Sequence, residues 1–324
     1  MRALVLDEEL CFVEDYPTPS PQPGEALIRV HMAGICNTDM ELVHGYMQFR
    51  GVLGHEFVGT VERAPGAEVW EGKRVVGDIN AACGVCATCR AGRHTHCPHR
   101  TTLGINGRDG ALAEYLTLPV ANLYAVLKDM PDEVTVFTEP LAAACEILEQ
   151  VHIHPTDRVI VLGDGKLGLL CAQVLALTGC ELTAIGRHAE KLDILARRGI
   201  ATLHVERNAT VQLAEIAGSA DVVVEATGHS DGYATACALV RPRGTLVLKS
   251  TYHGTVEANL TMAVVNEITL VGSRCGPFAP ALRLLERSAV NVTALIEARY
   301  PFDAILTAFA HAKQRGALKV LVSV

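Results

Sequence analysis

The sequence lacks several features, and each absence excludes a class of protein. No stretch of its 324 residues approaches the roughly 20 apolar residues of a membrane-spanning helix. The opening MRALVLDEEL has a brief apolar run and then acidic residues, without the longer apolar core of a secretory signal. Basic residues are outnumbered, with 28 Lys and Arg against 36 Asp and Glu, so the footprint of a nucleic-acid-binding chain is missing. We therefore expect a cytoplasmic protein that binds neither membranes nor nucleic acid.

Internal repeats, low-complexity tracts and long linkers are also absent. The length predicts two domains, and a chain of this size buries a large core without disulfides. In the cytoplasm thiols stay reduced. The eleven cysteines therefore predict metal ligands before disulfides wherever they cluster.

Four of the cysteines cluster in CGVCATCRAGRHTHC, with the spacing C-x2-C-x2-C-x7-C. Two glycines, Gly84 and Gly92, allow the turns that wrap a loop around an ion. Four thiolates close one tetrahedral zinc and leave no position for a substrate, so this site would be structural. An iron–sulfur cluster and free surface thiols are the alternatives; the rest of the chain points to hydride chemistry instead. The predicted ligands are Cys83, Cys86, Cys89 and Cys97.

A second set of potential ligands is spread along the chain. Cys36 and His55 flank the segment NTDMELVHGYMQFRGVLG, and Glu139 stands in FTEPLAAACEI. A thiolate, an imidazole and a carboxylate leave a fourth zinc position open for water or substrate. Taken singly, they also fit a core thiol, a buried ring and an acid at a helix N-terminus. Beside the four-cysteine loop, the combination predicts a catalytic zinc, so we expect two zinc ions per chain.

The middle of the chain carries a nucleotide-binding pattern. RVIVLG at 158–163 predicts a buried strand, GDGKLG follows it, and an apolar helix ends near Gly179 before a second strand at 181–186. Three glycines, Gly163, Gly165 and Gly168, permit a tight turn and a close backbone approach to a pyrophosphate. Further apolar runs in DVVVEATG, TLVLKS and EITLVGS alternate with helical segments. The pattern predicts a doubly wound parallel α/β sheet.

The end of the second predicted strand bears on the choice of nicotinamide cofactor. An NAD site normally has an acid there for the ribose hydroxyls. This chain has Gly186, Arg187 and His188 instead. The glycine leaves room and the arginine is a permanently charged partner for a 2′-phosphate. We therefore expect NADP(H) to be preferred over NAD(H), unless Arg187 is merely solvated surface.

Several motifs together resemble those of zinc-dependent medium-chain alcohol dehydrogenases over essentially the whole chain, nearest the polyol and glucose dehydrogenase branches. The resemblance rests on CNTD at 36–39, GHEFVGTV at 54–61, the four-cysteine loop, GALAEY, EPLA, VLGDGKLG and LKVLV. It implies a mostly β, GroES-like catalytic domain over 1–142 and 276–324, and a Rossmann cofactor domain over 143–275. It also implies a homo-oligomer, dimer or tetramer. Glu139 stands where animal relatives carry a second cysteine.

The resemblance also implies roles for individual residues. The zinc held by Cys36, His55 and Glu139 would polarise the substrate oxygen, and Thr38 would pass its proton outward. Glu56 is expected to displace a ligand during turnover, Asp39 to orient the site, and His44 and Tyr46 to extend the relay or line the pocket. The expected cofactor-binding residues are Gly163, Gly165, Lys166, Leu167, Gly168, Gly186, Arg187, Thr227, Ser250, Ser273 and Lys319.

The predicted function is hydride transfer between a secondary alcohol or polyol, or its carbonyl product, and a nicotinamide. An NADPH-dependent carbonyl reductase is the alternative within the same chemistry, because the reaction is reversible. A non-catalytic zinc- and nucleotide-binding protein and a zinc-ribbon module with a nucleotide-sensing domain are alternatives of other classes. The acidic charge and the open ligand set argue against both.

Overall fold

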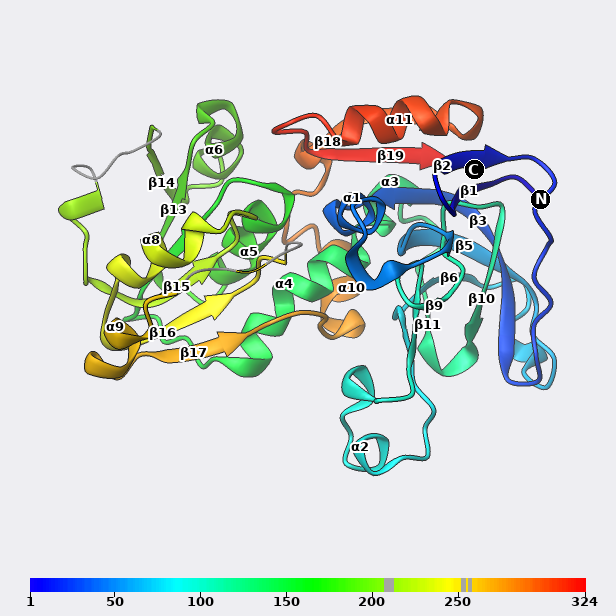
Figure 1. Ribbon diagram of the computed structural model, residues 1–324, viewed down its shortest axis with the longest axis horizontal. Coiled ribbons are helices and arrows are strands. Elements are labelled where there is room, and N and C mark those ends of the chain that lie inside the picture. Colours follow the sequence, from blue (N-terminus) through cyan, green and yellow to red (C-terminus); the bar gives the residue numbers. More distant parts are fainter. Residues whose placement is uncertain (207–212, 252–254, 256–257) are drawn as a thin grey trace. The chain divides into compact units, whose positions relative to one another are not determined.

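The computed structural model describes residues 1–206, 213–251, 255 and 258–324 (Figure 1). The chain divides into two compact units. One comprises Met1–Glu139 with Phe278–Val324, and the other comprises Pro140–Pro277. Within the described residues, no helix combines the length and the apolarity needed to cross a bilayer.

The second unit is built on a six-stranded sheet in which every pairing is parallel. The strand order is β14-β13-β12-β15-β16-β17. The chain starts at the central strand β12, adds β13 and β14 on one side of it, and then adds β15, β16 and β17 on the other side. This is the doubly wound order of a dinucleotide-binding sheet, and it confirms the predicted fold class. The strands are β12 (Arg158–Leu162), β13 (Glu181–Gly186), β14 (Ala201–His204), β15 (Ala220–Glu225), β16 (Val240–Leu248) and β17 (Thr269–Gly272).

Helices connect these strands. The helix α5 (Lys166–Ala176) joins β12 to β13, as GDGKLG and its apolar continuation predict. Strand β12 is buried along Val159–Leu162, which accounts for its continuous apolar sequence in the middle of a parallel sheet. One core cluster joins strand residues such as Val223 and Leu246 to α8 and α9. Other helices among the described residues of this part of the chain include α4 (Thr138–Gln150), α6 (Ala189–Ala196), α8 (Asp231–Leu239) and α9 (Leu260–Val265).

The first unit is mostly β-structure. A seven-stranded sheet has the order β11-β6-β5-β3-β19-β18, with β10 also paired to β3. Two three-stranded sheets, β2-β1-β4 and β7-β8-β9, complete it. Its strands are β1 (Ala3–Leu6), β2 (Leu10–Val13), β3 (Glu25–Ile35), β4 (Gly51–Val52), β5 (Glu56–Arg63), β6 (Arg74–Gly77), β7 (Asn80–Ala81), β8 (Thr101–Leu103), β9 (Gly107–Arg108), β10 (Tyr115–Pro119), β11 (Leu123–Ala125), β18 (Ile296–Pro301) and β19 (Lys319–Ser323).

The central strand β3 brings distant parts of this unit together. It is antiparallel to β5 on one side and to the C-terminal strand β19 on the other. Side chains along β3 alternate between buried and less buried positions over its first half, as one covered face of a sheet requires. The helices of this unit are α1 (Asn37–Val43), α2 (Ala87–Arg90), α3 (Asp132–Thr135), α10 (Phe278–Glu286) and α11 (Ile305–Ala312).

Candidate functional site

The four cysteines of the loop between β7 and β8 converge on one point. This loop carries α2 and projects from its unit in Figure 1. The Sγ–Sγ distance is 3.5 Å for Cys86–Cys89 and for Cys97–Cys83, 3.8 Å for Cys86–Cys97 and 4.0 Å for Cys83–Cys89. Four sulfurs about 2.3 Å from a central zinc are roughly 3.8 Å apart, whereas a disulfide requires about 2.05 Å. The loop thus has the spacing of a zinc tetrahedron.

The pKa shifts of three of these thiols are also consistent with a site that binds a cation. The backbone N–H groups of Val85 and Cys86 lower the pKa of the Cys83 thiol to about 6. The N–H of Cys89 lowers the pKa of Cys86 in the same way. Burial, reinforced by the neighbouring sulfurs, raises the pKa of Cys89 to about 12. The Cys89 thiol therefore resists ionisation beside two thiols that ionise readily, and a dication would supply the counter-charge that favours its thiolate.

The second candidate metal site forms where β3 and β5 run side by side. Gly34 pairs with Glu56 across the two strands, Cys36 follows β3 as the N-cap of α1, and His55 directly precedes β5. This pairing brings together residues about 20 positions apart in sequence. The Cys36 sulfur, a ring nitrogen of His55 and a carboxylate oxygen of Glu56 lie within 4.8 Å of one another. Both His55 and Glu56 are buried.

Asp39 ties the two ligand-bearing segments together. Its Oδ2 accepts a hydrogen bond from the Cys36 backbone N–H at 2.8 Å, and its Oδ1 accepts one from Gly54 N–H at 3.2 Å. The same Oδ1 lies 3.3 Å from Nδ1 of His55, which is buried and meets no partner in hydrogen-bond geometry. The fully buried Asp39 carboxylate thus orients both Cys36 and His55 from behind.

The electrostatics of this pocket favour positive charge. Burial by itself lowers the pKa of His55, but Asp39 and Cys36 outweigh burial and raise the pKa well above its ordinary value. Burial likewise opposes the charged form of Lys319, and Glu56 and Cys36 raise its pKa. Two different cationic groups are thus stabilised in one pocket. The Cys36 thiolate and the His55 imidazole, together with nearby carboxylates, are ligands that zinc accepts. The negative potential of the pocket also favours a cation.

The carboxylate of Glu56 is held by a buried ion pair that is not apparent from the sequence. Lys319, the first residue of β19, places Nζ 2.6 Å from Oε1 of Glu56 and also contacts Oε2. The neighbouring Gly34 makes room for this carboxylate, because a Cβ at that position would lie 2.2 Å from Oε2. The side chain of Lys319, expected among the cofactor-binding residues, is thus directed at Glu56.

The other predicted catalytic residues occupy different positions. Thr38 Oγ1 lies 3.8 Å from the Cys36 sulfur. Glu139, in the first turn of α4, is near enough for the charges of His55 and Glu56 to act on it, yet it lies outside the cluster of mutually close ligand atoms. Burial raises the pKa of Glu139 to about 7. The exposed His44 ends α1, where its backbone N–H bonds to carbonyls of that helix.

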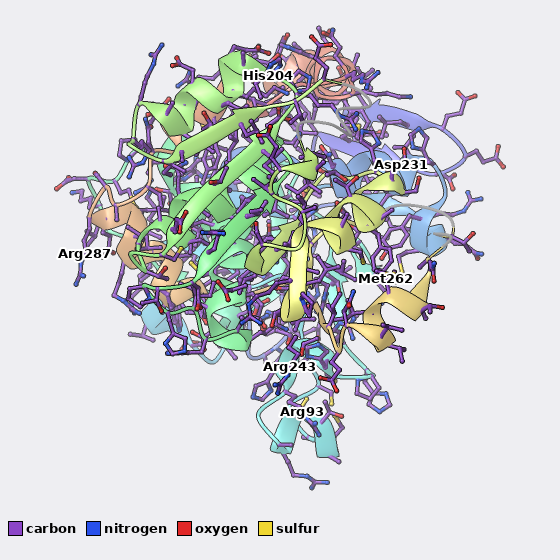
Figure 2. All side chains as sticks on the ribbon, turned by 90° about the vertical axis from the view of Figure 1, so that its left-hand side faces the viewer. Arg93, His204, Asp231, Arg243, Met262 and Arg287 are labelled. Atoms are coloured by element: carbon purple, nitrogen blue, oxygen red, sulfur yellow. The ribbon has the colours of Figure 1, made fainter. Side chains whose placement is uncertain are left out.

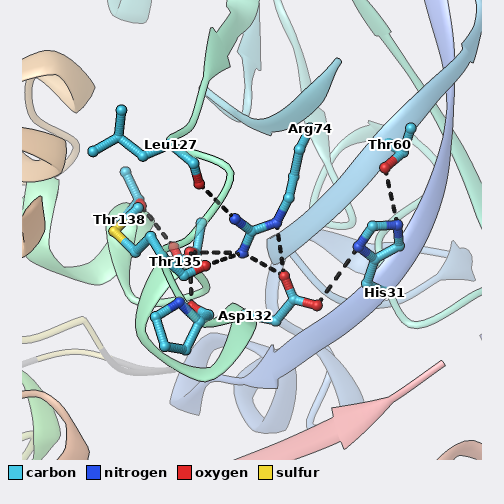
Figure 3. Close-up of polar contacts among 9 residues, drawn as sticks. His31, Thr60, Arg74, Leu127, Asp132, Thr135 and Thr138 are labelled. Carbon is cyan, nitrogen blue, oxygen red and sulfur yellow. Dashed lines mark hydrogen bonds and ion pairs between the residues drawn. The ribbon is translucent and has the colours of Figure 1, made fainter. Parts of the chain in front are cut away.

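An arginine-centred network fixes the segment that leads into α4 (Figure 3). The Arg74 guanidinium donates to Asp132 at 2.9 Å, to the Met130 carbonyl at 2.6 Å and to Thr135 Oγ1 at 3.1 Å. His31 on β3 lies 3.6 Å from the other oxygen of Asp132. These contacts join β6 and β3 to α3, which ends at Thr135, four positions before Glu139, and so support the position of Glu139.

The glycine-rich loop of the second unit has the geometry of a phosphate cradle. Gly163 has φ +122° and lies against the Ala226 carbonyl, and a Cβ on Gly168 would lie 2.1 Å from the Gly163 carbonyl oxygen. A Cβ on Gly165 would instead meet no protein atom within 4 Å. The first and third glycines are therefore required by packing within the protein. The second leaves open space at the N-terminus of α5, where Lys166 and Leu167 form the first turn.

Beyond that loop, the structure links further predicted cofactor residues to groups that sequence reasoning missed. Buried Glu225, at the end of β15, accepts hydrogen bonds from Thr227 Oγ1 at 2.6 Å and from Ser250 Oγ at 3.0 Å. Ser273 Oγ accepts one from Lys249 Nζ at 3.2 Å. All five residues end a parallel strand or follow one within two residues, at the sheet edge where such folds bind nucleotides. In the sequence, the only sign that Glu225 and Lys249 belong to this region is that each stands at the end of an apolar run.

An unforeseen acid also binds the turn after β13. Asp164, inside the glycine-rich loop, accepts hydrogen bonds from the backbone N–H groups of Arg187 and His188. A carboxylate is therefore present near the end of β13, although Gly186 itself carries none. The only sequence signal for a role of Asp164 was its position within GDGKLG. That position does not reveal which groups its side chain contacts.

Comparison with known proteins places the chain in a family. Residues 22–129 match the alcohol dehydrogenase GroES-like domain, and residues 167–287 match the zinc-binding dehydrogenase family. The erythritol/L-threitol dehydrogenase of Mycolicibacterium smegmatis is 28% identical over 316 residues, covering 89% of this chain and 87% of that protein. The sorbitol dehydrogenase of Halalkalibacterium halodurans is 28% identical over 328 residues, covering 96% and 95%.

A solved structure agrees over the full length. A provisionally assigned zinc-binding dehydrogenase from Sinorhizobium meliloti 1021, bound to NADP, is 30% identical, with a TM-score of 0.88 and coverage of 100% of this chain and 99% of its own. The chain therefore belongs to the zinc-dependent medium-chain alcohol dehydrogenases, and the resemblance seen in its motifs is confirmed. It is an oxidoreductase that acts on CH–OH groups with a nicotinamide cofactor.

Proposed function

We propose that this enzyme oxidises a secondary alcohol or polyol, or reduces the corresponding carbonyl compound, with NADP(H) as the preferred cofactor. The observation that carries the proposal is the convergence of Cys36, His55 and Glu56 within 4.8 Å in a pocket that stabilises positive charge. The names of the erythritol/L-threitol and sorbitol dehydrogenases support a polyol as substrate.

The residues divide the work of the proposed reaction. Cys36 and His55, with Glu139 directly or through water, would hold a catalytic zinc, and the four-cysteine loop would hold a second ion. When bound, zinc supplies a Lewis acid for the substrate oxygen, and the nicotinamide exchanges a hydride with the carbinol carbon. Thr38 Oγ1 would accept a hydrogen bond from the substrate hydroxyl and, as it takes up that proton, release its own proton outward toward solvent. His44, which is exposed at the end of the same helix, would extend this relay.

Glu56 and Lys319 form an ion pair beside the proposed zinc ligands. Their ion pair keeps a carboxylate beside the two zinc ligands while balancing its charge with a buried cation. Glu56 is thus available as an exchangeable metal ligand, in keeping with the role expected for it.

The experiment that tests the proposed function is a substrate panel. Tetritols, pentitols, hexitols and simple secondary alcohols are oxidised with NADP and with NAD, before and after treatment with a zinc chelator. Turnover of at least one polyol, lost with the metal and restored by zinc, is expected. Turnover that survives complete zinc removal would contradict the proposal.

The preference for NADP(H) is a separate prediction that depends on Arg187. Its exposed guanidinium would pair with the 2′-phosphate, and one charge-assisted hydrogen bond contributes about 1.5–3 kcal/mol. At about 1.4 kcal/mol per tenfold, Arg187→Ala should weaken NADP(H) by roughly ten- to a hundredfold and leave NAD(H) nearly unchanged. The measurement is kcat/KM with both cofactors. Equal losses, or a wild type that prefers NAD, would refute it; the S. meliloti structure with NADP supports it.

We also propose that the enzyme is a cytoplasmic homo-oligomer. All eleven cysteines lie among the described residues, and no disulfide links any two of them, as expected in a reducing compartment. The edge strand β17 and helix α9 expose apolar side chains, with Leu270 40%, Val264 75% and Val265 70% accessible. Met262, also on α9 (Figure 2), is 49% accessible. Such a patch on a sheet edge favours self-association. Sedimentation equilibrium tests this, and a monomer at micromolar concentration would contradict it.

A further inference from the structure

The carboxylate of Asp164 occupies the place of a missing side chain. Gly186 ends β13, where a nicotinamide-binding sheet normally carries an acid. A Cβ built on Gly186 would lie 2.4 Å from Oδ2 and 2.5 Å from Cβ of Asp164. An acid of the glycine-rich loop thus fills the volume that a side chain at position 186 would occupy.

The hydrogen bonds of Asp164 point into the protein. Oδ2 accepts from the backbone N–H of Arg187 at 2.6 Å and of His188 at 2.7 Å, and it lies 3.0 Å from Nδ1 of the His188 ring. A carboxylate only accepts hydrogen bonds, so Nδ1 of His188 carries the proton in this contact. The Asp164 side chain is 11% exposed. Its charge is thus engaged by the turn and is not directed toward a ribose.

The same turn is held from its other side by β14. Nε2 of His204 lies 3.1 Å from the Arg187 carbonyl, and Val205 N–H donates to the Gly186 carbonyl at 2.9 Å. His204 lies at the end of β14 (Figure 2). Both ends of the Arg187 backbone unit are therefore fixed, its N–H by Asp164 and its carbonyl by His204. The side chains of Arg187 and His188 remain accessible to solvent.

We propose that Asp164 is a positioning residue that sets cofactor selectivity. By fixing the N–H groups at 187 and 188, it holds the Arg187 and His188 side chains where they meet the 2′-phosphate of NADP(H). This inference rests on the proposed function of the enzyme as a nicotinamide dehydrogenase. The opposite role, in which Asp164 accepts the ribose hydroxyls of NAD(H), predicts the opposite change in selectivity, so experiment separates the two.

The test is direct binding of NADP(H) and NAD(H) by calorimetry, which does not depend on turnover. In Asp164→Ala, the affinity for NADP(H) should fall at least about tenfold while that for NAD(H) stays within about threefold. Asp164→Asn keeps the shape and one acceptor oxygen, so it should show a smaller fall in the same direction, and it also serves if the alanine variant does not fold. A weaker NAD(H) complex with unchanged or tighter NADP(H), or equal losses with both cofactors, would overturn the inference.

Two controls sharpen the result. Asp157 directly precedes β12, whereas Asp164 follows the other end of that strand. Like Asp164, Asp157 accepts a backbone hydrogen bond, from His154 N–H at 2.7 Å. Asp157→Ala should therefore leave cofactor selectivity unchanged. If Asp164 acts through Arg187, then Arg187→Ala should cost much less NADP(H) affinity in the Asp164→Ala background than in the wild type. Fully additive losses would overturn the inference. A wild type that binds neither cofactor would instead overturn the proposed function, and the inference with it.

Discussion

Cys36→Ser is expected to abolish turnover while leaving NADP(H) binding intact. Lewis-acid stabilisation is worth several kcal/mol, and about 1.4 kcal/mol corresponds to tenfold in rate, so kcat/KM should fall at least about a thousandfold. The predicted cofactor residues of the glycine-rich loop and of the β13 turn belong to the other unit of the chain, so they keep their geometry. The measurements are steady-state kinetics, cofactor binding by calorimetry and zinc content by mass spectrometry.

A matched control uses a cysteine outside both clusters. Cys11 is exposed on β2, and Cys11→Ser should keep full activity and two zinc ions per chain. Cys36→Ser should keep only one ion, held by the four-cysteine loop. Undiminished activity in Cys36→Ser would sink the proposed mechanism. A loss of cofactor binding equal to the loss of turnover would show a general disruption of the fold instead.

Cys89→Ser is expected to remove the other zinc ion and to lower stability strongly. Residues 83–97 lie between the two-residue strand β7 and the three-residue strand β8, and Gly84, Val85 and most of their neighbours are exposed. Few apolar contacts therefore hold the loop without a metal. Loss of a structural metal is among the changes that cost several kcal/mol, which corresponds to a fall in Tm on the order of 10 °C.

The measurement is calorimetric unfolding together with zinc content and activity at low temperature. Below the new transition the Cys36 site should still turn over substrate, because its proposed ligands lie at the end of β3, at the start of β5 and in α4, outside the four-cysteine loop. Cys171→Ser is the control, since Cys171 is fully buried in α5 away from any cysteine cluster, and it should keep both zinc ions. Normal stability in Cys89→Ser combined with lost turnover would show that the loop is not structural.

The sequence by itself determined the local parts of this protein. The strand, glycine-rich loop, helix and strand from 158 to 186 follow one another along the chain, so residue order and apolar periodicity were sufficient to predict them. The same holds for the four-cysteine loop, in which at most seven residues separate one predicted ligand from the next. In both cases the geometry follows from short-range backbone constraints.

The tertiary structure alone decided which distant groups meet. Lys319 reaches Glu56 across 263 residues of sequence because β19 and β5 both pair with β3. Asp164 reaches the turn at 187 because the parallel strands β12 and β13 end at the same edge of their sheet. Strand pairing fixes these contacts, and pairing depends on the whole buried surface of a sheet. The sequence around a charged residue therefore does not identify the distant residue that strand pairing brings next to it.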